Sequence, residues 1–349
     1  MKTRILYHFN FQDLQGFKNL GGLIFVLFFL LFAFVQCKHP TQSDDFIGPE
    51  ITPENFLVLN NSFSALKSNV DFHTEAQSFE ATFSNKIKWT IRIKGLESGA
   101  VKKLSGTSKS LDASISAWDG AADSVFFFSA GEKCVAEINF FNSTLSLSDT
   151  FQIKNEKKYE GVLIDDFETY TTNLVGIDSS FKDASDNNVT IDFANKTTKV
   201  QGKNSLLLSG LDKNANFWIV GVNTAANALN GRFPATKSNE LYINISVYGK
   251  GDKLANLSVR LTEDDDNSGE FETANDDAFT YLIAVDWKGW KRVSIPYSSF
   301  TDGDASIGNN TAEPSKLKGM SLALVANSST QNVSLHADYI IFTTGGPLK

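Results

Sequence analysis

The cysteine and histidine residues of this chain are too few and too scattered to form a nucleophilic catalytic site. Cys134 lies in the alternating segment 132–138, where a small buried hydrophobe is the expected role. His73 and His336 are far apart in the sequence. Since a nucleophilic Cys or Ser needs a base within hydrogen-bond reach, no such pair is supported. We expect no catalytic residues, although the many carboxylates keep an acid–base hydrolase as an alternative.

One strand carries polar and aromatic residues suited to ligand contact. Residues 241–248 alternate, so the aliphatic side chains face a core and Tyr242, Asn244, Ser246 and Tyr248 share the other face. Aromatic rings beside amide and hydroxyl groups suit a sugar, because its CH faces stack on rings and its hydroxyls take hydrogen bonds. The alternative is an ordinary hydrated sheet face.

Three further residues extend this candidate site. In the strand 257–262 the same parity places Arg260 outward, where its guanidinium can donate hydrogen bonds. Trp218 and Trp287 each neighbour a turn or loop and are alternative aromatic platforms. The predicted ligand contacts are therefore Tyr242, Asn244, Tyr248, Arg260, Trp218 and Trp287.

An acidic run at 263–270 has part of the spacing of a calcium-binding loop. Asp264, Asp266 and Ser268 occupy positions one, three and five, and Gly269 occupies position six. Position twelve is Asn275, so the usual bidentate Glu is missing. We expect a charged hairpin tip, or the rim of a sugar site.

Composition limits the partners and the number of domains. The 349 residues suggest two ordinary domains, and the hydrophobic content of 42% suffices for packed cores. A formal net charge of −8 argues against nucleic acid, because phosphate binding needs clustered Lys and Arg.

The N-terminus carries an export signal. Basic residues precede the apolar run 20–35, which is a little short for a membrane span. With Cys37 directly behind it, this segment resembles a bacterial lipoprotein leader, which implies a signal peptide at 1–36 and lipidation of Cys37. An uncleaved signal-anchor helix is the alternative. Residues 37–50 are polar and are expected to form a tether.

Residues 51–158 have the pattern of a β-sandwich. In 86–94 every second residue is apolar, with Trp89 on the core face, and six or seven such short strands follow one another. The strand at Trp89, the Trp118-Asp119-Gly120 corner and the Gly131-led last strand resemble the immunoglobulin-like domain of the flagellar hook-capping protein. That resemblance implies a spacer, with Trp89 and Trp118 in packing roles.

Residues 159–349 have a different order of β motifs. Asp166-Phe-Glu168 opens the unit, a Gly-Lys-Asn-Ser-Leu strand follows at 202–206, Trp-x-x-Val-x-Ile-Pro lies at 290–296 before Phe300, and Asp-Tyr-Ile closes it at 338–340. This order resembles the galactose-binding-like jelly roll of family-11-type carbohydrate-binding modules. It implies an all-β fold that binds polysaccharide or oligosaccharide without cleaving it. In such folds acidic residues of the first and last strands often share a structural Ca²⁺, which implies Asp166, Glu168 and Asp338 as ligands.

The sequence thus predicts an all-β lipoprotein of the outer membrane or cell surface, with an immunoglobulin-like spacer and a carbohydrate-binding jelly roll. The alternatives are a structural or adhesive surface protein that binds another protein, and a glycoside hydrolase or its accessory.

Overall fold

The computed structural model describes residues 56–168, 175–183, 188–211, 218–303, 306–327 and 331–349. These residues are almost entirely β, which confirms the predicted fold class. The described helices are a single turn each: α2 (Ala113–Ser116), η3 (Tyr297–Ser299) and η4 (Pro314–Lys316). No helix in this part of the chain is long and apolar enough to cross a bilayer. The predicted signal peptide, the tether and Cys37 lie outside the described residues.

The first folded region is one six-stranded sheet in the order β1-β3-β5-β6-β2, with β4 pairing β3. Its strands are β1 (Val58–Ala65), β2 (Asn69–Asp71), β3 (Phe79–Gly95), β4 (Val101–Leu111), β5 (Lys133–Phe140) and β6 (Ser146–Asn155). The long β3 pairs with β1, β4 and β5. Its pairings with β1 and β4 each contain a register shift, which is typical of a bulge that bends a strand.

The two tryptophans of this region pack as the sequence predicts. Trp89 is buried, and its Nε1 donates to Ser108 Oγ at 2.8 Å. Trp118 is buried between Phe72 and Phe128, and its Nε1 donates to the Ala121 carbonyl at 2.8 Å. Both indoles therefore stabilise the core and have their N–H groups satisfied.

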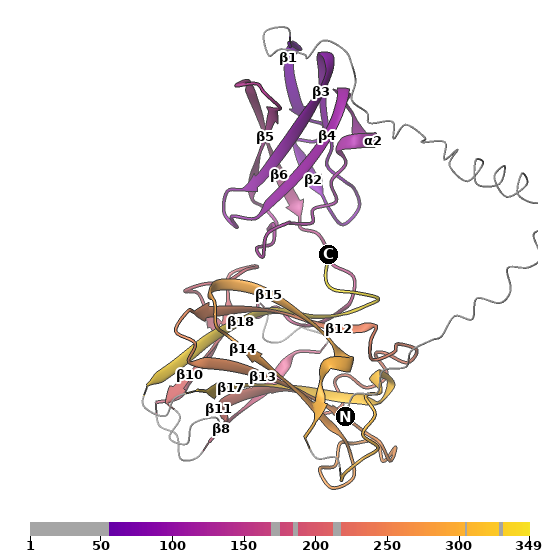
Figure 1. Ribbon diagram of the computed structural model, residues 1–349, viewed down its shortest axis with the longest axis vertical. Coiled ribbons are helices and arrows are strands. Elements are labelled where there is room, and N and C mark those ends of the chain that lie inside the picture. The colour runs from indigo at the N-terminus through magenta and orange to yellow at the C-terminus, as the bar shows by residue number, and fades with distance from the viewer. Residues whose placement is uncertain (1–55, 169–174, 184–187, 212–217, 304–305, 328–330) are drawn as a thin grey trace, which may run out of the picture. The chain divides into compact units, whose positions relative to one another are not determined.

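The second folded region is a sandwich of two six-stranded sheets (Figure 1). The first, called the β12 sheet here, has the order β15-β12-β18-β10-β9, with β7 pairing β18. Its strands are β7 (Val162–Asp165), β9 (Thr190–Asn195), β10 (Ser205–Leu211), β12 (Leu241–Lys250), β15 (Lys288–Pro296) and β18 (Asn332–Thr344).

The second sheet, called the β13 sheet here, has the order β16-β14-β13-β17-β11-β8. Its strands are β8 (Ile177–Lys182), β11 (Trp218–Thr224), β13 (Ala255–Glu263), β14 (Ala278–Ala284), β16 (Thr301–Asp302) and β17 (Leu317–Ala326). Neighbouring strands in both sheets are antiparallel.

The hydrophobic core lies between these two sheets, because each strand turns its alternate aliphatic residues inward. On β12 the inward residues are Leu241, Ile243, Ile245 and Val247, all fully buried. On β13 they are Leu257, Val259 and Leu261, also fully buried. Both parities agree with the sequence prediction. Each sheet therefore has one outer face on which a ligand site could lie.

Candidate functional site

The outer face of the β13 sheet carries two parallel rows of side chains. Residues paired across neighbouring strands lie on the same face, so the register fixes their order. One row, the small-and-apolar row, runs Leu282, Ser258, Ala323, Gly221 and Phe181. The other, the polar row, runs Thr280, Arg260, Ser321, Asn223 and Ser179.

The small-and-apolar row forms a hollow because its central residues are small. A Cβ atom at Gly221 would collide with the ring of Phe181 and with the carbonyl oxygen of Leu322. Glycine therefore leaves space for the Phe181 ring against β11. The Phe181 ring meets Trp218 edge to face, with centroids 5.1 Å apart. An aromatic pair thus borders one end of the hollow.

The polar row is partly pre-organised by its own hydrogen bonds. Ser321 Oγ donates to Asn223 Oδ1 at 2.7 Å, and Asn223 Nδ2 donates to Ser179 Oγ at 3.4 Å. These two hydrogen bonds fix the orientation of the Asn223 amide before any ligand arrives.

Arg260 is the charged member of the polar row. Its guanidinium lies over the Phe271 ring at 5.6 Å. No hydrogen bond or ion pair joins it to another residue in the part of the chain that the structure describes. Partial burial lowers the pKa of Arg260. A guanidinium stays charged in proteins, so its donors can bind a ligand.

Together the rows line a groove of about 460 Å³. Its lining residues are Phe181, Trp218, Asn223, Ser258, Arg260, Ser321, Ala323 and Val325. Ligand sites for small molecules typically combine an apolar lining with a few oriented polar groups, and this groove has both.

The structure separates the six sequence-predicted contacts into two sets. Trp218 and Arg260 line the groove on the β13 sheet. Tyr242, Asn244 and Tyr248 lie on β12, and Trp287 precedes β15, so they belong to the opposite sheet. The two sets therefore cannot contact one short saccharide together, since the sandwich core lies between them.

The outer face of β12 is largely covered. Asn244 is 1% exposed: its Nδ2 donates to the Ile341 carbonyl at 3.1 Å and to Thr343 Oγ1 at 2.9 Å. Its Oδ1 accepts from the Leu348 backbone N–H at 3.0 Å. Asn244 also adjoins a register shift between β12 and β18. Regular pairing is interrupted there, so a side chain can take over hydrogen bonds to the backbone. This amide holds the C-terminal segment in place.

The aromatic residues near β12 are packed as well. Tyr248 meets Trp290 and His336 edge to face, with centroids 5.6 and 5.7 Å apart. Trp287 Nε1 donates to the Val247 carbonyl at 3.2 Å, and the Lys291 ammonium lies 4.6 Å from its ring centroid. Tyr242 is half-buried on the same strand. Tyr242, Asn244, Tyr248 and Trp287 therefore stay a prediction for a separate surface on the β12 sheet, where all but the half-buried Tyr242 already have protein partners.

Sequence reasoning missed several residues of the groove. Phe181, Asn223 and Ser321 lie on β8, β11 and β17, which come together only through register. Their strands alternate as β13 does, so parity alone could have placed them outward. Parity does not show which strands are neighbours, and the groove strands are spread over residues 177 to 325.

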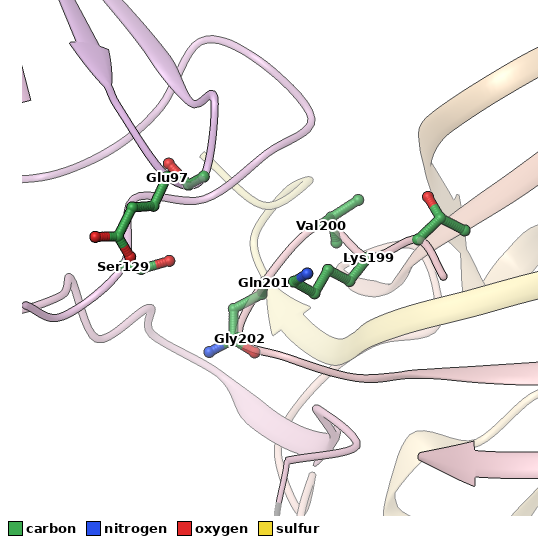
Figure 2. Close-up of a pocket in the computed structure, with 8 residues that line it drawn as sticks. Glu97, Ser129, Lys199, Val200, Gln201 and Gly202 are labelled. Atoms are coloured by element: carbon green, nitrogen blue, oxygen red, sulfur yellow. The ribbon is translucent and has the colours of Figure 1, made fainter. Parts of the chain in front are cut away.

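The predicted calcium ligands lie around the loop before β10. Asp338 Oδ2 accepts from the backbone N–H groups of Val200 at 2.8 Å and Gln201 at 3.3 Å. Glu168 Oε1 accepts from Lys203 N at 2.6 Å and Asn204 N at 2.7 Å. Figure 2 shows this loop from Lys199 to Gly202, which also lines a pocket of about 220 Å³ with Glu97 and Ser129. None of the described residues lining that pocket is aromatic, so it offers a sugar no ring to stack on.

The same loop contains oxygen atoms that fit a hard cation. Among the described residues, the buried side-chain oxygens Gln201 Oε1 and Asn204 Oδ1 have no hydrogen-bond partner. Burial raises the pKa of Asp338 to about 8. The hydrogen bonds from backbone N–H groups oppose this rise, and the nearby charge of Glu168 adds to it. Orphaned amide oxygens beside two acidic residues are groups that Ca²⁺ could satisfy. Asp166 Oδ1 accepts from the Glu168 N–H at 3.2 Å, and Asp166 stays a predicted ligand.

The acidic loop after β13 forms a turn held by its own carboxylates. Asp264 accepts from the backbone N–H groups of Ser268 at 2.9 Å and Gly269 at 3.0 Å, and pairs with Lys318 at 2.9 Å. Asp266 also accepts from Ser268 N at 2.9 Å. These bonds agree with the predicted charged hairpin tip.

One buried Ser–His contact exists in the described residues, on the β12 sheet. Ser205 Oγ and His336 Nδ1 are 3.3 Å apart, while Ser205 is fully buried and donates to the Thr198 carbonyl at 2.7 Å. A serine nucleophile must reach a substrate, and this hydroxyl is buried in a structural contact. The pair therefore gives no support for hydrolysis.

Comparison with known proteins finds distant structural likeness. No protein-family profile matches the chain, and no curated protein matches it either. A family 11 carbohydrate-binding module from Clostridium thermocellum, in complex with a β-1,3-1,4-mixed-linked tetrasaccharide, has a TM-score of 0.36 at 16% identity, covering 54% of this chain and 98% of that one. SGBP-B from a complex xyloglucan utilization locus in Bacteroides uniformis has a TM-score of 0.35 at 11% identity, covering 77% of this chain and 69% of its own. A family 30 module of a Clostridium thermocellum cellulosomal cellulase has a TM-score of 0.34 at 13% identity, covering 54% and 99%. Such likenesses are too distant to establish what this chain binds.

Proposed function

We propose that this protein is a non-catalytic glycan-binding lipoprotein of the cell surface, and that the groove on the β13 sheet holds the saccharide. The observation that carries the proposal is the pairing of an aromatic end, Phe181 and Trp218, with an oriented polar row that includes Arg260. Sugar rings stack on aromatic faces while their hydroxyls take hydrogen bonds, so one groove serves both needs.

The remaining parts of the proposal rest on the sequence. Cys37 after the apolar segment supports a lipid anchor, and the immunoglobulin-like region, by its resemblance, serves as a spacer. Metabolic labelling with a palmitate analogue tests the anchor. Wild type should be labelled and Cys37→Ala should not, whereas labelling of both would place the lipid elsewhere.

We further propose that Glu168 and Asp338 bind a structural Ca²⁺ with the orphaned amide oxygens of Gln201 and Asn204. When bound, the ion would supply positive charge to a buried acidic loop. Its residues already fix the loop through backbone hydrogen bonds, so the ion would add stability to the loop rather than chemistry.

Titration of soluble polysaccharides, neutral and acidic, against the full chain in detergent tests the function. Under the proposal at least one glycan binds, Trp218→Ala weakens it, and Tyr242→Ala or Tyr248→Ala changes it little. Loss of binding in the two tyrosine variants alone would place the site on the β12 sheet. Absence of binding to every glycan would favour a structural or adhesive protein.

A further inference from the structure

A second group of carboxylates lies beyond the end of β13, apart from both sites described above. One carboxylate oxygen from each of Glu263, Asp265 and Glu313 lies within 4.8 Å of the others. Asp277, just before β14, lies beside the same group. A Cβ atom at Gly308 would collide with Asp277 Oδ1 and lie 2.8 Å from Asp265 Oδ2, so both carboxylates border the same point. Four acidic side chains from three separate segments thus converge.

Two of these carboxylates are buried and incompletely satisfied. Glu263 is fully buried, and its Oε1 accepts from the Tyr297 hydroxyl at 2.7 Å and from Glu313 N at 2.6 Å, while its Oε2 has no partner among the residues that the structure describes. Asp277 is 1% exposed, and its Oδ2 accepts from Asn309 N at 3.1 Å and Asn310 N at 2.7 Å, while its Oδ1 has no partner within the described ranges. A buried carboxylate oxygen without a partner is costly, so each one needs an explanation.

The positive charge within the described residues does not balance the group. Lys316 is the one cation ion-paired to it there, 3.4 Å from Asp265 Oδ1 and 2.6 Å from Glu313 Oε2. One lysine cannot neutralise four carboxylates, so a divalent cation would supply the missing positive charge.

We propose that Glu263, Asp265, Asp277 and Glu313 form a second divalent-cation site, and that Ca²⁺ is the ion it takes. All of the candidate ligand atoms are oxygens, which favours a hard cation over zinc. Ca²⁺ accepts several protein carboxylates, whereas Mg²⁺ keeps more of its waters and uses only one or two. The ion would connect the end of β13, the residue before β14 and the residue before η4. The loop between β13 and β14 also contains Phe271, whose ring lies beneath the Arg260 guanidinium.

The neighbouring acidic group serves as an internal contrast. Asp264, Asp266 and Asp276 also place three oxygens within 4.8 Å. There, however, Asp276 accepts from Asp265 N and Glu272 N, both at 2.7 Å, and Asp264 is paired with Lys318. Their carboxylates already organise the turn, so this group carries no site, and Asp266→Asn is a matched control in the same loop.

Calcium binding to the full chain in detergent, after metal removal with EDTA, tests this proposal by calorimetry. Wild type is expected to bind Ca²⁺ at this site, and Asp277→Asn and Glu263→Gln should each weaken that binding by roughly tenfold or more, while Asp266→Asn leaves it unchanged. Binding at the Glu168–Asp338 site is counted separately, because Glu168→Gln removes only that contribution. Unchanged Ca²⁺ binding in both Asp277→Asn and Glu263→Gln would overturn the assignment.

Hydrogen exchange on the wild-type chain gives a readout that does not depend on the folding of a variant. Added Ca²⁺ should slow amide exchange in 263–277 and 308–316, because the ion joins these segments. Exchange that stays the same in both segments at saturating Ca²⁺ would also refute the site. Neither measurement involves a glycan, so failure of this proposal is distinct from failure of glycan binding.

Discussion

Replacement of Arg260 by Met tests the groove most sharply, because the wild-type side chain has no polar partner to lose within the described residues. Within the described residues its guanidinium lies over the Phe271 ring at 5.6 Å, and a cation–π contact at an exposed site contributes roughly 0.5–1 kcal/mol. Met keeps a similar length and apolar stem. We therefore expect the free energy of unfolding to change by about 1 kcal/mol at most.

The effect of Arg260→Met on binding should be larger. A hydrogen bond to a charged donor contributes roughly 1.5–3 kcal/mol, and removal of the guanidinium deletes at least one such bond to the ligand. Since about 1.4 kcal/mol corresponds to a tenfold change, Kd should rise roughly 10- to 100-fold. An acidic glycan should lose more affinity than a neutral one, because its carboxylate pairs with the charge.

Isothermal titration of the best-bound polysaccharide against wild type and Arg260→Met, with thermal unfolding of both, measures these two effects. Arg92→Met on β3 is a matched control, since Arg92 is an exposed strand arginine of the first folded region. Arg260→Met with unchanged affinity and unchanged stability would refute the groove as the binding site. Equal weakening by Arg92→Met would indicate a nonspecific effect of charge.

Three further results follow from buried positions. Gly221→Ala should destabilise the protein by roughly 1–3 kcal/mol in thermal or denaturant unfolding, because the new Cβ would collide with the backbone oxygen of Leu322. Stability equal to wild type would show that β11 and β17 can move apart to accept the methyl group. Cys134 is fully buried, and burial together with the charge of Glu132 raises the pKa of its thiol, so peptide mass spectrometry should find it unmodified by iodoacetamide until the chain unfolds. Burial and the charge of Lys250 lower the pKa of His336 to about 4. The stability that this neutral imidazole contributes is therefore present above pH 6.5 and lost as the pH falls toward 4, and His336→Gln should flatten that part of the stability curve; identical curves for both proteins would contradict this.

Local patterns were sufficient to predict the strands and their inward faces. The alternation of 241–248 and 257–262 fixed which residues of β12 and β13 enter the core, because side chains on a strand point to opposite faces in turn. The burial of Trp89 followed from the same alternation, whereas the packing role of Trp118 came from the resemblance to an immunoglobulin-like domain.

The outer faces could not be assigned in this way, because what covers a face comes from elsewhere in the chain. Tyr242, Asn244 and Tyr248 look like an open polar face in sequence, yet Asn244 is sealed by Thr343 and Leu348, about a hundred residues away. The acidic residues show the same limit. Spacing singles out Asp264, Asp266 and Ser268. In this region, however, Glu263 and Asp277 each hold a buried carboxylate oxygen without a partner among the described residues, and they meet Glu313 only after β13, β14 and η4 are in place.

The sequence by itself therefore determined the all-β class, the core-facing parity and the likeness of its N-terminus to a lipoprotein leader, since each depends on residues within a few positions of one another. Only the tertiary structure decided which sheet face is open, which strands lie side by side along the groove, and which carboxylates share a buried pocket of charge. Those outcomes depend on strand register and on loop contacts between distant segments, and no local period encodes them.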